Sequence, residues 1–262
     1  MNQLIKVEWF KIRGFVTFWI LTGLFAVLLP LFNYQFSSGM MQTGGAVPIS
    51  YSFPGVWSNF GFWASWFALF IAFVVIILVT NEYRYRTNRQ NIIDGWTRMQ
   101  AFHAKCLLVL LLSLITTIYV GTWCIIFGAA YSNTGFAFFT QDMEKLLYFF
   151  ILCLNYYGFA MMLSFLLRRS GLSIGIFMLY AFIFENIAKA YLNWQIKGAL
   201  IGNFLPLQAS DELLPFPLMK QAEAIAYKGA AMPESSSYVI ASVIYISLYY
   251  IISRYRLLKS DW

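Results

Sequence analysis

Long apolar runs alternate with short polar segments along the whole chain. The six runs long enough to cross a membrane lie near residues 15–36, 58–80, 104–131, 146–167, 170–190 and 236–254. A helix needs about 20 apolar residues to cross a hydrocarbon core of about 30 Å. The runs are too long for the strands of a membrane barrel, and they do not alternate as such strands do. The pattern predicts an all-α integral membrane fold, with six transmembrane helices in a single transmembrane domain covering residues 1–262.

Charge is sparse, and it is concentrated in one place. Residues 14–81 contain no Asp, Glu, Lys or Arg over 68 positions, whereas residues 81–105 hold five basic residues, two acidic residues and the only histidine. The whole chain is 60% hydrophobic and 11% charged, whereas soluble domains are about 25% charged. The chain is therefore built for lipid, and its polar segment between the second and third spans must lie in water beside the membrane.

The basic residues predict the orientation of the spans. The N-terminal segment, the 81–105 loop, the turn after the fourth span and the C-terminal tail together carry 13 of the 18 Lys and Arg residues. Cytosolic segments carry such an excess, so both ends are expected inside the cell. The net charge of +7 is then a topology signal, and no nucleic-acid partner is expected.

Residues 2–13 are expected to form an amphipathic helix among the lipid headgroups of the inner leaflet. A simple charged flank is the alternative. The apolar residues close to one face of this helix are Leu4, Ile5, Trp9 and Ile12.

Two outer features follow from composition. Residues 191–235 contain four prolines but keep apolar patches, which predicts a broken outer segment with short helices dipping into the outer leaflet. Six aromatic residues between positions 51 and 66 are expected to form a belt at the membrane surface. The alternative is that these rings line a binding site for a cofactor or ligand. The six residues are Tyr51, Phe53, Trp57, Phe60, Trp63 and Trp66.

Several spans carry small or charged residues. Ala64, Ala68 and Ala72 recur every four residues, which lets another helix approach closely, either in a second subunit or within the chain. The fifth run has only 15 uncharged residues, 170–184, so Glu185 must reach the outer boundary. Its i, i+4 spacing to Lys189 predicts an ion pair, and an acid at this depth is a candidate for the transport pathway.

Few catalytic motifs are present. The sequence has no G-x-x-x-x-G-K-[ST] loop, and a single histidine excludes H-E-x-x-H and most zinc sites. Residues 171–175 match G-x-S-x-G, but a nucleophile elbow needs a base within reach of Ser173, and only His103 is available. Helix packing through Gly171 and Gly175 is the favoured interpretation. The three cysteines lie in apolar runs and are expected to be core side chains.

The 81–105 segment resembles the cytosolic loop of permease subunits in the type-2 ABC exporter family. The matching features are an acid after the second span, a threonine, an apolar pair, a Ser/Thr-Arg pair and a lysine that opens the third span. They are Glu82, Thr87, Ile92-Ile93, Thr97-Arg98 and Lys105. The segment departs from the family at Arg86, where glycine usually precedes the threonine, and at Gly95-Trp96, where a proline is frequent.

The resemblance implies a permease subunit of an ATP-driven exporter in the bacterial cytoplasmic (inner) membrane. It would pair with a second permease, identical or sister, and sit on two separate cytosolic ATPases that bind ATP and Mg²⁺. The chain itself would have no catalytic residue and bind no cofactor or metal. The loop of residues 81–103 would be the coupling helix, with Glu82 braced against Arg86 or Arg89. The residues expected to contact the ATPase are Glu82, Arg86, Thr87, Arg89, Ile92, Ile93, Trp96 and Arg98.

Three alternatives remain open from the sequence. The chain could be an intramembrane enzyme using Ser173 or Glu185, or an ion-coupled carrier or scaffold. The 81–105 loop could also be a solvated connector that is held inside the cell by its basic residues alone.

Overall fold

In the described part of the chain, the regular elements are all helices, joined by turns, and there is no strand. The computed structural model describes residues 12–42, 50–85, 87, 90, 93, 95–132, 136, 138–196, 200–215, 223, 227 and 233–259. The long helices are α2 (Val16–Gln42), α3 (Gly55–Arg84), α5 (Arg98–Tyr131), α6 (Glu144–Leu167) and α11 (Ser235–Leu258). The shorter ones are α7 (Ser170–Leu179), η1 (Tyr180–Phe184), α8 (Glu185–Gln195), η2 (Ile201–Phe204) and α9 (Gln208–Asp211). The predicted amphipathic helix at 2–13 lies almost wholly outside the described residues.

Six helical stretches are long and apolar enough to cross a membrane, as the hydrophobic pattern predicts. They are Val16–Ser38, Gly55–Arg84, Arg98–Tyr131, Glu144–Leu167, Ser170–Gln195 and Ser235–Leu258. The chain is therefore a multi-pass membrane protein. The ends differ from the predicted ones by a few residues, because capping decides where a helix begins. The side chain of Thr97 accepts a hydrogen bond from the backbone N–H of Gln100, and the Gln100 side chain accepts one from the backbone N–H of Thr97, which starts α5 earlier than its apolar run does.

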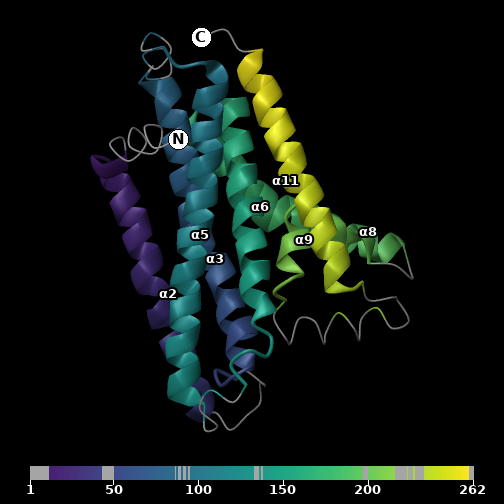
Figure 1. Cartoon of the computed structure of the whole chain (residues 1–262). Helices are drawn as coiled ribbons and strands as arrows, with labels where there is room; N and C mark the ends of the chain where they lie inside the picture. Colours follow the sequence, from purple (N-terminus) through teal and green to yellow (C-terminus); the bar gives the residue numbers. More distant parts are fainter. Residues whose placement is uncertain are drawn as a thin grey trace.

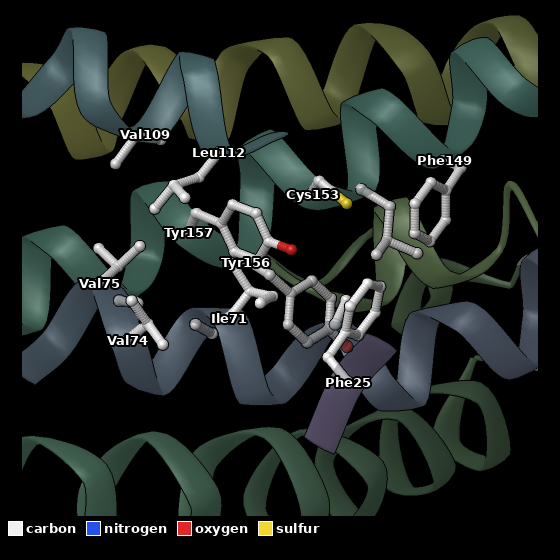
Figure 2. Close-up of a cluster of buried hydrophobic side chains, with 14 of the residues drawn as sticks. Phe25, Ile71, Val74, Val75, Val109, Leu112, Phe149, Cys153, Tyr156 and Tyr157 are labelled. Carbon is white, nitrogen blue, oxygen red and sulfur yellow. The ribbon is translucent and has the colours of Figure 1, made fainter. Parts of the chain in front are cut away.

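Helix α6 is the centre of the bundle and packs against α3, α5 and α11. Figure 1 shows these helices running side by side, with α2 on the outer side of the bundle. Figure 2 shows Tyr157 of α6 among side chains of α3 and α5, including Ile71 and Leu112. Tyr157 is fully buried, and its hydroxyl lies 3.4 Å from the hydroxyl of Thr116. Apolar contact, with few polar links, holds the centre together.

The predicted belt of surface aromatics is wrong for four of its residues. Tyr51, Phe53, Trp57 and Phe60 are buried inside the bundle, and only Trp66 is highly exposed. The Trp57 indole donates a hydrogen bond to the carbonyl of Phe139, 3.2 Å away. Each aromatic ring removes a large apolar area from solvent when it is packed. These four rings therefore pack against α5 and the turn that follows it, and they do not form a belt at the membrane surface.

The fifth span is not one straight helix. A π-helical segment, η1, separates α7 from α8, and Figure 1 shows α8 projecting to the side of the long helices. The short helix α9 packs against both α6 and α11. Within the predicted 191–235 segment, residues 200–215 form the short helices η2 and α9 and return toward the bundle, so this part of the segment is broken as expected.

Candidate functional site

The polar 81–105 loop is closed at its base by a buried ion pair. Glu82 lies in the last turn of α3 and Lys105 in the second turn of α5. The Lys105 Nζ is 2.7 Å from the Glu82 Oε1, and both side chains are less than one-tenth exposed. Removing one partner of such a pair leaves an uncompensated buried charge, which is strongly unfavourable. The pair therefore joins the helix that enters the loop to the helix that leaves it.

The same end of α5 is tied to the C-terminal end of α11. The Arg98 guanidinium donates a hydrogen bond from Nη1 to the carbonyl oxygen of Leu258 at 3.0 Å. The last carbonyls of a helix have no partner within that helix, and a cation there also suits the helix dipole. One helical turn further along α5, the His103 Nε2 lies 3.3 Å from the Tyr250 hydroxyl. Two contacts thus link the exit of the loop to the sixth span.

A third contact joins α3 to the end of α6. The Arg168 guanidinium carbon lies 5.3 Å from the centre of the Tyr83 ring, within the range of a cation–π interaction. Arg168 adopts a left-handed conformation with φ of 57°, and its N–H closes α6 by donating to the carbonyl of Ser164. The ends of four long helices therefore meet around the base of the loop.

Five of the eight predicted ATPase contacts, Glu82 and Arg98 among them, lie in this described end. Ile93 is 76% exposed, and Gly95 has a φ of +91°, which a glycine adopts without strain. Arg86, Arg89 and Ile92 lie outside the described residues. Among the described residues, Glu82 pairs with Lys105, a pairing that the sequence interpretation did not foresee, and the predicted brace to Arg86 or Arg89 falls on residues outside the described ranges. An acid that ends one span and a lysine that begins the next were the available signal. The remaining two described contacts are Thr87 and Trp96.

A second polar cluster surrounds Glu185, and here the predicted ion pair with Lys189 is wrong. Glu185 is 1% exposed, and its Oε1 accepts hydrogen bonds from the backbone N–H groups of Leu207 at 2.7 Å and Gln208 at 3.3 Å. These are the first N–H groups of α9, which need partners from outside that helix. The Lys189 ammonium instead contacts Glu212. Glu185 thus holds the returning segment in place.

Asn155 of α6 holds the same segment from the opposite side. Its Nδ2 donates to the carbonyl of Pro206 at 2.7 Å and to the hydroxyl of Ser210 at 2.9 Å. Gly202 is required nearby, because a Cβ there would lie 2.5 Å from the carbonyl oxygen of Lys189. Asn155 therefore fixes residues 206–210 to α6.

The structure does not assemble a hydrolase site at the G-x-S-x-G match. Ser173 is fully buried, and its hydroxyl has no hydrogen-bond partner among the described residues. His103 is exposed and contacts Tyr250 instead. A Cβ at Gly171 or Gly175 would meet no atom within 4 Å, so neither glycine packs closely against a described neighbour.

The predicted small-residue stripe of α3 and the cysteines lie mostly inside the bundle. Ala64, Ala68 and Ala72 are fully buried within the chain. Cys124 and Cys153 are buried and Cys106 is half-buried, all as free thiols. Within the described ranges, no group of three His, Cys, Asp or Glu side chains could hold a metal ion.

The fold and its two polar regions thus define a multi-pass helical membrane protein with a polar loop braced at one end. The sequence matches no protein-family model, and no curated protein or solved structure matches it.

Proposed function

We propose that the chain is the permease subunit of an ATP-driven exporter and that a separate cytosolic ATPase moves it through the 81–105 loop. Both ends of the chain then face the cytosol, and the N-terminal segment lies among the inner headgroups. A second permease, identical or sister, completes the pathway. ATP and Mg²⁺ bind the ATPase, and the assembly sits in the bacterial cytoplasmic membrane. The chain supplies the path for the substrate and no catalytic residue.

The buried pair of Glu82 and Lys105 is the observation that carries this proposal. A loop held only by its sequence connection would bend when it is pushed. Here the pair joins α3 to α5, and Arg98 joins α5 to the end of α11. A displacement of the loop is therefore passed to three long helices as a rigid-body motion.

The exposed surface of the loop suits a protein partner. Ile93 and Tyr85 are 76% and 63% exposed, and Arg84 is exposed beside Tyr85. A few apolar and arginine anchors commonly supply most of the energy of an interface. The ATPase is expected to offer an apolar groove bordered by acidic residues.

Photo-crosslinking tests the proposal directly. A benzoylphenylalanine residue at position 93 is expected to crosslink to a soluble ATPase when cells are irradiated and the chain is purified. The matched control is position 115, where Ile115 is 61% exposed on α5 within a candidate span, and it should crosslink to no ATPase. Two outcomes would contradict the proposal. One is no crosslink to an ATPase from position 93, and the other is an equal yield of that crosslink from position 115.

Labelling of a cysteine tests the orientation. Ile93→Cys, in a chain whose three native cysteines are replaced by alanine, is expected to react with an impermeant maleimide only after the cells are opened. Reaction in intact cells would place the loop outside and exclude the ATPase.

An ion-coupled carrier is the second candidate, and Glu185 is the observation that favours it. Its Oε2 has no hydrogen-bond partner among the described residues, so this buried carboxyl has a free position for a proton or cation. A carrier would transport in proteoliposomes without an ATPase and lose this activity in Glu185→Gln, whereas a permease would be inactive without its ATPase.

A further inference from the structure

A cavity of about 540 Å³ lies between α3, α6, the bend at η1 and α8, and the returning segment. Its volume is within the range of small-molecule sites, which are largely apolar with a few placed polar groups. The wall from α3 and η1 is aromatic and includes Phe62, Trp66 and Phe182. The lining residues from α8 and the returning segment include the charged ones.

The charged wall contains more acid than base. Among the described lining residues, three carboxylates accompany a single ammonium group, that of Lys189. Lys189 contacts Glu212 directly and lies 3.6 Å from the Glu223 Oε1. The Asp211 carboxylate is bound by the Tyr156 hydroxyl, 2.9 Å from each oxygen, and has no ion pair with a described cation. Among the described lining residues, acids therefore outnumber bases, and Asp211 is an acid of this wall that has no described counter-ion.

Burial, together with the negative charge of the neighbouring Glu212, raises the pKa of Asp211 from 3.8 to about 7. The hydrogen bond from Tyr156 and the charge of Lys189 lower the pKa but do not offset this. A raised carboxyl pKa is the expected consequence of an acid whose negative charge lacks enough compensation. A cation bound next to Asp211 would supply that compensation.

The aromatic wall offers a complementary surface for such a cation. The Trp66 side chain is 52% exposed although it lines the cavity, and its ring centre lies 5.7 Å from that of Phe182. An indole face attracts a cation through its quadrupole and provides a flat apolar surface for rings. Acid on one wall and aromatic rings on the other select a ligand that is both positive and hydrophobic.

We propose that this cavity binds an amphipathic organic cation, with its apolar rings against Trp66 and Phe182 and its positive charge near Asp211. An organic anion of the same shape is repelled by the excess of carboxylates, and a neutral ring compound gains nothing from Asp211. Binding requires only this chain. That the bound cation is also the exported cargo rests on the proposed function.

The test uses two probes of nearly the same shape and opposite charge. Tetraphenylphosphonium and tetraphenylborate each carry four phenyl groups around one charged centre. The full-length chain is placed in phosphatidylcholine nanodiscs, and each probe is titrated by calorimetry, with empty nanodiscs as the blank for partition into lipid. The cation is expected to bind saturably at one site per chain, whereas the anion should show only the partition seen with empty nanodiscs.

Substitutions locate the binding in the cavity. Asp211→Asn keeps an acceptor for the Tyr156 hydroxyl and is expected to weaken cation binding about tenfold. Trp66→Leu changes an exposed side chain and is expected to weaken binding about fivefold, within the range of a cation–π contact. The matched controls are Asp142→Asn, an exposed acid outside the cavity, and Trp19→Leu, whose side chain is 51% exposed on α2. Both controls should bind as the unchanged chain does.

Saturable binding of tetraphenylborate equal to that of the cation would overturn the proposal. Unchanged cation binding in both Asp211→Asn and Trp66→Leu would also overturn it, because Trp66→Leu does not alter the buried core. No ATPase is present in this experiment, so its failure and the failure of the crosslinking test at position 93 are separate results.

Discussion

Two buried glutamates at different places in the bundle show two ways of accommodating a carboxylate. Glu82, at the base of the loop, is paired with the charged side chain of Lys105. Glu185, beside the returning segment, is bound by two backbone N–H groups at the start of α9. The first arrangement requires full charge on both partners, whereas the second requires only an acceptor oxygen. The loop base is thus an electrostatic connection between helices, and the returning segment is held by hydrogen bonds.

Breaking the ion pair should have the largest effect. Lys105→Met removes the ammonium group that contacts the buried Glu82 carboxylate and is expected to lower the free energy of unfolding by about 3–5 kcal/mol. The double variant Lys105→Met/Glu82→Leu removes both charges and should recover most of that loss, since an apolar pair of similar volume is often neutral. Thermal unfolding in one detergent measures all three proteins. A double variant no more stable than the single one would show that the pair is not the source of the loss.

Substituting Glu185 should have an intermediate effect that depends on the substituent. Glu185→Ala leaves the N–H groups of Leu207 and Gln208 without their acceptor and is expected to cost about 2 kcal/mol. Glu185→Gln keeps an acceptor oxygen and should stay within about 1 kcal/mol of the unchanged chain. Glu82→Gln should be clearly more destabilising than Glu185→Gln, because an amide cannot neutralise Lys105. Equal losses in the two glutamine variants would remove the distinction between the two regions.

The smallest effect should come from pH, through Asp211. Because its folded pKa is raised to about 7, the folded chain binds a proton that the unfolded chain releases near pH 4. The free energy of unfolding should therefore fall by about 1 kcal/mol as the pH rises from 6 to 8, and Asp211→Asn should remove that part of the slope. Identical slopes in the two proteins would exclude this assignment. The titratable groups around Asp211 are Tyr156 on α6, Glu185 and Lys189 on α8, and the adjacent Glu212.

Much of the fold was predictable because a long apolar run must be removed from water, whether lipid or another helix covers it. The six spans follow from that signal. The start of α5 did not follow from it, because the capping pair of Thr97 and Gln100 begins the helix six residues before the apolar run. The partners of the charged side chains were not predictable in the same way. Glu185 and Lys189 have suitable spacing on a helix, but each finds a partner that is more than 20 residues away in the sequence.

The sequence by itself determined that this chain crosses a membrane with six helices and that its charge gathers in one loop, because both properties depend only on local composition. Tertiary structure alone decided which charges meet, that the fifth span bends at a π-helical segment, and that the aromatic residues 51–60 face inward. These outcomes depend on how helices distant in the chain pack together. A buried charge or ring contacts whichever groups the packed helices place beside it. The spacing of residues along one helix does not determine which groups those are.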